Sequence, residues 1–92
     1  MTTISTHVLD TARGVPAEGL RITLFRSTGE QVATGVTNHD GRVPGFIPES
    51  VKLVAGTYRM HFDTGAYFVD HGTTGFYPFV DVTFELVADG HY

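Results

Sequence analysis

Apolar and polar residues alternate with a period of two along most of the chain, and this pattern predicts β-strands. The alternation is clearest near the C-terminal end, where every second residue from Val80 to Leu86 is apolar. Similar patterns indicate further strands at about residues 4–9, 20–25, 31–37 and 57–62. Such alternation places one face of each strand on the core and the other toward solvent. Strands at these short, regular intervals are typical of an antiparallel β-sandwich.

Segments rich in glycine and proline separate the predicted strands. Residues 11–19 and 27–30 contain glycines that break the alternation, and we expect loops there. Residues 38–41 read Asn-His-Asp-Gly and predict a tight turn, because Asp-Gly tolerates the positive φ that such turns require. Residues 43–50 contain Pro44 and Pro48, which favours a short edge strand and a loop, since proline cannot donate a ladder hydrogen bond.

One short helix is expected between the last two strands. Asp63 or Thr64 could cap one or two helical turns through residues 66–71, and Gly72 would end them. The sequence contains no internal repeat and no linker. Residues 1–92 are therefore interpreted as one all-β domain, an antiparallel sandwich with a single short helix.

Composition and charge narrow the classes of partner. A chain of 92 residues buries only roughly 60% of its unfolded surface, so association with further copies would stabilise it. The net charge of −4, with six lysines and arginines in all, argues against nucleic acid or an anionic membrane as the partner. The sequence has no cysteine, no basic and apolar leader and no apolar run of about 20 residues. We therefore expect a cytoplasmic protein without disulfides or thiolate chemistry.

His7 and Arg42 are the two side chains best suited to chemistry. If Val8 faces the core, His7 points outward, where packing does not explain a histidine. Imidazole is well suited to proton transfer near neutral pH. Arg42 directly follows the predicted turn, where its guanidinium could orient an anionic or carbonyl-rich substrate through paired hydrogen bonds. From the pattern alone, a solvated strand histidine and an ordinary exposed arginine are the more common explanations.

Metal and nucleophile chemistry have little support. His61 and Asp63 would share one strand face, a weak bidentate arrangement, and no cysteine assists them. No serine stands in a Gly-x-Ser-x-Gly setting. General acid–base activation of water is the chemistry left open. None of the histidines forms a recognised ligand spacing: His7, His39, His61, His71 and His91.

Residues 7–22, HVLDTARGVPAEGLRI, resemble the N-terminal signature of the transthyretin and 5-hydroxyisourate hydrolase family. The resemblance continues through TNHDGRVPG (37–45), AGTYRMHFDTGAYF (55–68) and GFYPFVDVTFE (75–85). It implies an eight-stranded sandwich with one short helix. It also implies homotetramers that enclose a central channel, with ligand sites at the dimer–dimer interface.

Within that family the chain resembles the hydrolase branch, in which histidine begins the signature and arginine follows the Asp-Gly turn. The resemblance implies that His7 is a catalytic acid–base group and that Arg42 holds the substrate, 5-hydroxyisourate. Hydrolysis of its ring amide in urate catabolism would yield 2-oxo-4-hydroxy-4-carboxy-5-ureidoimidazoline and would need no cofactor or metal. Two readings compete: a non-catalytic prealbumin-like binding module, and a small-ligand carrier, which the histidine in place of the carrier's lysine disfavours.

The sequence departs from the family pattern at its C-terminal end. Family hydrolases continue after a pair like His91-Tyr92 with a second active-site histidine, two strands and a final Tyr-Arg-Gly-Ser. None of these residues is present here. We expect that the given sequence omits such a tail and is a truncated form of the domain.

Overall fold

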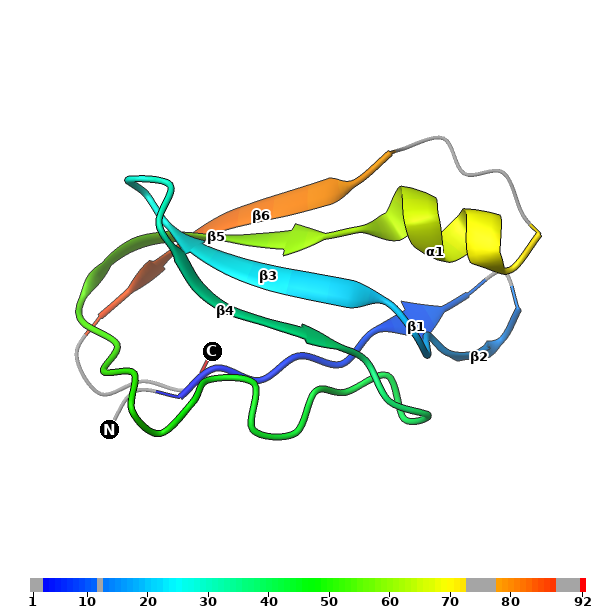
Figure 1. Cartoon of the computed structure of the whole chain (residues 1–92), viewed down its shortest axis with the longest axis horizontal. Helices are drawn as coiled ribbons and strands as arrows, with labels where there is room; N and C mark the ends of the chain where they lie inside the picture. Colours follow the sequence, from blue (N-terminus) through cyan, green and yellow to red (C-terminus); the bar gives the residue numbers. More distant parts are fainter. Residues whose placement is uncertain (1–2, 12, 73–77, 88–91) are drawn as a thin grey trace.

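The computed structural model describes residues 3–11, 13–72, 78–87 and 92. Four strands form one sheet in the order β4-β3-β5-β6, and two short strands pair as a separate hairpin, β1-β2 (Figure 1). Every pairing between these strands is antiparallel. The elements in chain order are β1 (Leu9–Asp10), β2 (Val15–Pro16), β3 (Arg21–Arg26), β4 (Gln31–Val36), β5 (Gly56–Phe62), α1 (Thr64–Asp70) and β6 (Val80–Leu86).

The four-stranded sheet carries most of the core on one face. In the register, Leu24 on β3 lies opposite Met60 on β5, and Tyr58 lies opposite Phe84 on β6. This face packs against an irregular second layer, made of the N-terminal residues and the segment between β4 and β5 (Figure 1). The second layer contributes apolar side chains to the core, among them Ile4, Val8, Phe46, Ile47 and Leu53.

The main predicted strands are confirmed, whereas the second layer is less regular than expected. Residues 4–9 were expected to form a full strand, but only Leu9–Asp10 does so, with an isolated bridge between His7 and Arg42. The predicted inside–outside alternation nevertheless holds through residues 3–10. Residues 43–50 form no strand, because Pro44 and Pro48 lack N–H donors and Gly45 adopts φ 64° between them.

The C-terminal residue joins this second layer through its backbone. The Tyr92 N–H donates to the Thr3 carbonyl at 2.8 Å, and the Tyr92 carbonyl accepts from the Ser5 N–H at 2.6 Å. The Tyr92 ring also lies 6.4 Å from that of Phe84, between the centroids. Tyr92 therefore packs beside the N-terminal segment and against the sheet.

Helix α1 ends as predicted but is not held as predicted. Gly72 follows it with φ 68°, a conformation that glycine adopts without steric cost. Asp63 occupies the N-cap position, yet its side chain makes no capping hydrogen bond. The helix is fastened instead by Tyr67, whose hydroxyl donates to Asp10 Oδ2 at 2.7 Å. This buried bond joins residues 57 positions apart and ties the helix to β1.

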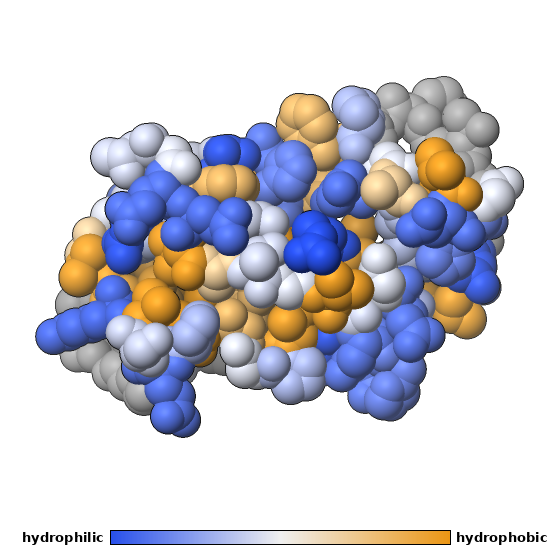
Figure 2. Space-filling view, in the orientation of Figure 1, coloured by the Kyte–Doolittle hydropathy of each residue, from blue (hydrophilic) through white to orange (hydrophobic). Residues whose placement is uncertain are grey.

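The predicted apolar face of β6 is only partly covered. Leu86 is buried, but Val80 and Val82 are 39% and 48% exposed. Figure 2 shows that apolar side chains also reach the surface elsewhere, interrupted by hydrophilic ones. In the described residues no helix is long and apolar enough to cross a membrane.

Replacing Tyr67 with phenylalanine tests the tie between helix and hairpin. We expect Tyr67→Phe to lower the free energy of unfolding by about 1–3 kcal/mol at pH 7, because the lost hydrogen bond is made to a carboxylate. The Tyr58 hydroxyl donates to the Val54 carbonyl at 2.7 Å and accepts from Arg26 Nη1 at 3.0 Å, so Tyr58→Phe, which also loses a hydrogen bond to a charged group, should cost a similar amount, about 1–3 kcal/mol. Urea titration of the three chains measures both differences. Equal stability of parent and Tyr67→Phe chains would contradict the role of this bond.

The stability difference between the parent and Tyr67→Phe should also depend on pH. Burial raises the pKa of the Tyr67 phenol, and its hydrogen bond to Asp10 raises it further. A raised phenol pKa stabilises the fold only while the phenol is protonated. The advantage of the parent over Tyr67→Phe should therefore be constant between about pH 7 and pH 10 and shrink above that range as Tyr67 ionises.

Candidate active site on the outer face of the N-terminal segment

His7 lies on the exposed face of the N-terminal segment. Along residues 3–10 the odd-numbered side chains are exposed, and the even-numbered ones are partly or fully buried. The outward orientation of His7 that alternation predicts is therefore confirmed. Its neighbour on this face, Leu9, is 60% exposed. His7 is thus accessible to a substrate or to a second surface.

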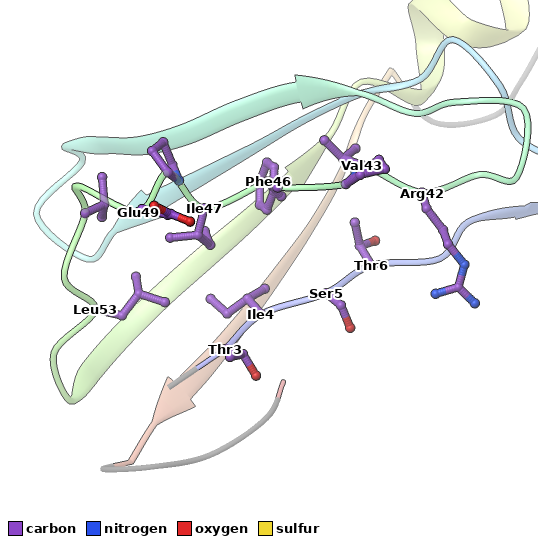
Figure 3. Close-up of a pocket in the computed structure, with 14 residues that line it drawn as sticks. Thr3, Ile4, Ser5, Thr6, Arg42, Val43, Phe46, Ile47, Glu49 and Leu53 are labelled. Carbon is purple, nitrogen blue, oxygen red and sulfur yellow. The ribbon is translucent and has the colours of Figure 1, made fainter. Parts of the chain in front are cut away.

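The structure brings Arg42 directly beside His7. The two residues face each other in an antiparallel bridge. Residues opposite each other in such a pair have Cβ atoms about 4.5–5.5 Å apart, so both side chains leave from neighbouring points on the same face. Figure 3 shows that Arg42, Thr3 and Ser5 extend to one side of the segment, away from Ile4. An imidazole and a guanidinium separated by 35 positions in sequence thus meet on one exposed surface.

A buried glycine makes this meeting possible. Gly41 adopts φ 76°, and a Cβ built on it would lie 2.3 Å from the Val8 carbonyl oxygen. The Gly41 carbonyl accepts a hydrogen bond from the Val8 N–H at 2.9 Å. The Val8 carbonyl in turn accepts from the Ala17 N–H at 3.0 Å. The turn before Arg42 is therefore joined by backbone contact to the residue that follows His7.

The side chain that closes this turn is Asn38. Asn38 Oδ1 accepts hydrogen bonds from the Asp40 and Arg42 N–H groups at 2.9 and 3.1 Å. Asp40, the residue that sequence reasoning assigned to the turn, instead places its carboxylate 3.4 Å from His39 Nε2. Both of those side chains are well exposed, at 78% for His39 and 63% for Asp40. Sequence reasoning missed Asn38, although an asparagine at the start of a turn is a known signal of this geometry.

An apolar cavity lies beside the same segment, and Arg42 is among the residues that line it. It has a volume of about 450 Å³ and separates the N-terminal residues from residues 42–53. Figure 3 shows the side chains of Ile4, Phe46, Ile47 and Leu53 gathered around it. His7 does not line this cavity. Arg42 thus borders both the exposed outer face and the cavity, whereas His7 borders only the outer face, where the two side chains meet.

His61 and His71 lie away from this site and have structural partners. His61 does not pair with Asp63, because β6 places Asp81 opposite it, and His61 Nδ1 lies 2.7 Å from Asp81 Oδ1. His71 stacks on Tyr67, with ring centroids 4.2 Å apart. His91 lies outside the described residues. Among the residues that the structure describes, no three histidine or acidic side chains are grouped so that they could hold a metal ion.

Comparison with known proteins identifies the relatives of this chain. The model of the HIUase/Transthyretin family matches residues 4–92. The 5-hydroxyisourate hydrolase of Mus musculus is 41% identical over 91 residues, which cover 94% of this chain and 76% of the mouse protein. The 5-hydroxyisourate hydrolase of Deinococcus radiodurans is 44% identical over 96 residues, which cover 97% of this chain and 81% of that protein.

Two solved structures show the same fold. The 5-hydroxyisourate hydrolase of Klebsiella pneumoniae superposes with a TM-score of 0.86 at 36% identity, over all of this chain and 84% of that one. Transthyretin from Sparus aurata superposes with a TM-score of 0.85 at 33% identity, over 95% of this chain and 78% of that one. The transthyretin-like sandwich predicted from the sequence is thereby confirmed.

Two glycine substitutions separate backbone strain from steric contact at the site. Gly41 and Gly45 both have positive φ, at 76° and 64°, but only Gly41 has an atom within 4 Å of an added Cβ. Gly45→Ala should cost about 1–2 kcal/mol of stability through its φ alone. Gly41→Ala should cost about 2–5 kcal/mol, because the turn must also move away from Val8. Thermal or urea unfolding measures both, and equal losses would mean that the contact with Val8 is unimportant.

Proposed function

The chain belongs to the HIUase/Transthyretin family, and from this we propose that it hydrolyses 5-hydroxyisourate to 2-oxo-4-hydroxy-4-carboxy-5-ureidoimidazoline in urate catabolism. The observation that carries the proposal is the pairing of His7 with Arg42 on one exposed face. A general base and an anion-binding cation are the two groups that hydrolysis of a urate-like ring requires from the protein. The hydrolase relatives agree with this choice of substrate.

In the proposed reaction, His7 acts as the general base. Its imidazole takes a proton from a water molecule as the water oxygen attacks a ring carbonyl carbon of the substrate. The tetrahedral species then collapses, the C–N bond breaks, and the imidazolium returns its proton to the departing nitrogen. The step needs no cofactor, since the proton is borrowed and returned. Proton transfer by a positioned side chain contributes typically 10²–10⁴-fold in rate.

Arg42 orients the substrate and stabilises the developing negative charge. Its planar guanidinium can donate two parallel hydrogen bonds to adjacent oxygen or nitrogen acceptors of the ring. A fixed donor aimed at an oxyanion is typically worth about 2.7–4 kcal/mol. The backbone bridge to His7 supports this role, because it fixes the distance between base and cation before substrate arrives.

We also propose that the active assembly is a homotetramer with its sites at the dimer–dimer interface. A single chain leaves the His7 face open to solvent, and the apolar side chain of Leu9 is exposed beside it. A facing copy would cover this surface and exclude water from the reaction. It would also bury additional apolar surface, which would stabilise a chain of 92 residues whose own core is small.

Replacing His7 with glutamine tests the assignment of the base. The decay of freshly generated 5-hydroxyisourate, followed spectroscopically, should be accelerated by the parent chain. His7→Gln should lower kcat at least about 100-fold, because glutamine cannot accept the proton. His39→Gln alters an exposed histidine three residues from Arg42 and should leave the rate unchanged. No acceleration by the parent would refute the function, and an active His7→Gln chain would refute only the role of His7.

The molar mass in solution tests the assembly. Light scattering should give four times the mass of one chain. Leu9→Glu places a charge on the proposed interface and should shift the mass toward smaller species. Val36→Glu, on an exposed valine of β4, should leave it unchanged. A parent chain that is monomeric at micromolar concentration would contradict the tetramer.

A further inference from the structure

We infer that Asn38 is a positioning residue, which sets the place and direction of the Arg42 guanidinium. The inference rests on the proposed hydrolase function, in which Arg42 binds substrate. Asn38 itself does not share the exposed face with His7; its polar groups point into the turn.

Asn38 holds both backbone polar groups of Arg42. Its Oδ1 accepts from the Arg42 N–H at 3.1 Å, and its own N–H donates to the Arg42 carbonyl at 2.7 Å. The Asn38 carbonyl also accepts from the Gly41 N–H at 2.9 Å. Two further groups of the turn, the Asp40 N–H and the Gly41 N–H, thus converge on the same residue. Asn38 therefore holds the peptide groups on both sides of Arg42, one through its side chain and the other through its backbone N–H.

The same turn is anchored on its other side to the strand that carries His7. The Gly41 carbonyl accepts from the Val8 N–H at 2.9 Å. The contact with Val8 prevents the turn from shifting along the N-terminal segment. The hydrogen bonds to Asn38 instead set the backbone conformation of residues 38–42. The direction in which the Arg42 side chain leaves the backbone therefore depends on Asn38. A displacement of about 1 Å in a positioning group can cost on the order of 10²-fold in rate.

The neighbouring side chains do not share this role. His39 and Asp40 are exposed and lie against each other, with His39 Nε2 3.4 Å from Asp40 Oδ2. Asn38 is partly buried, and its Oδ1 accepts hydrogen bonds from the backbone N–H groups of Asp40 and Arg42. Asp40 therefore offers a matched control, a polar residue of the same turn whose side chain holds none of these amides.

The test uses two substitutions that differ in one property. Asn38→Leu keeps the branched shape and removes the acceptor, whereas Asn38→Asp keeps an acceptor oxygen at the same distance from the backbone. Steady-state kinetics should show kcat/KM falling about 10–100-fold in Asn38→Leu. Asn38→Asp should remain within about 5-fold of the parent, and Asp40→Ala within about 2-fold. Full activity in Asn38→Leu, or no recovery in Asn38→Asp, would overturn the inference.

A double-substitution cycle separates positioning from general loss of stability. In a chain that already carries Arg42→Gln, adding Asn38→Leu should change the residual rate by less than about 2-fold, because its effect acts through Arg42. Losses that multiply independently would show that Asn38 acts elsewhere and would overturn the inference. If Asn38→Leu does not fold, Asn38→Ala, which also removes the acceptor, replaces it throughout.

Amide hydrogen exchange makes the result independent of catalysis. Exchange of the Arg42 amide should accelerate at least about 10-fold in Asn38→Leu and stay near the parent rate in Asn38→Asp. If the parent does not hydrolyse 5-hydroxyisourate, the proposed function fails, and this measurement alone still decides whether Asn38 holds Arg42. An unchanged Arg42 exchange rate in Asn38→Leu would overturn the inference whatever the activity.

Discussion

The candidate site depends on one close backbone contact, between Gly41 and Val8. The Gly41 carbonyl lies 2.9 Å from the Val8 N–H, and the absence of a side chain at position 41 allows the approach. This contact brings a turn from one part of the second layer against the strand that carries His7. The joint action proposed for His7 and Arg42 depends on this contact and on the antiparallel bridge between the two residues. A backbone hydrogen bond is well suited to this task, since it sets register without occupying the outer face.

The two layers of the sandwich are unequal in regularity, and this bears on function. The four-stranded sheet is held by long ladders from β4 to β6, with one register shift between Leu24 and Phe25 in the pairing of β3 with β4. In the part of the chain that the structure describes, the second layer contains the short hairpin, the bridge at His7 and the backbone contacts of Tyr92, but no long ladder. Apolar side chains pack it against the sheet, and single buried hydrogen bonds, such as that between Tyr67 and Asp10, tie it to the helix. The chemistry is thus proposed on the less regular layer, where separate local contacts must supply the rigidity that a ladder supplies elsewhere.

Local patterns in the sequence predicted the sheet and the orientation of His7, since alternation reports directly which face a side chain occupies. The Asp-Gly turn likewise predicted the place of Arg42. Three features could not be read in this way. The tie between Tyr67 and Asp10 spans 57 positions and leaves no local signal. The exposure of Val82 depends on what covers β6, which alternation does not report. In the turn, Asn38 and Asp40 both carry suitable oxygens, and only the three-dimensional geometry shows that Asn38 uses its own.

An exposed His–Arg pair is a weak catalyst by itself, because water screens the charge of the guanidinium and competes for its donors. The same pair becomes effective when the site is covered and the geometry is fixed in advance. The turn closed by Asn38 supplies the second condition from within the chain. The first must come from a surface that meets the His7 face, and the exposed Leu9 beside His7 is an apolar group of the kind such a surface would bury. Fixing Arg42 beside His7 within one chain and covering the pair with another chain are thus separate requirements. The isolated chain meets the first, and the proposed tetramer would meet the second.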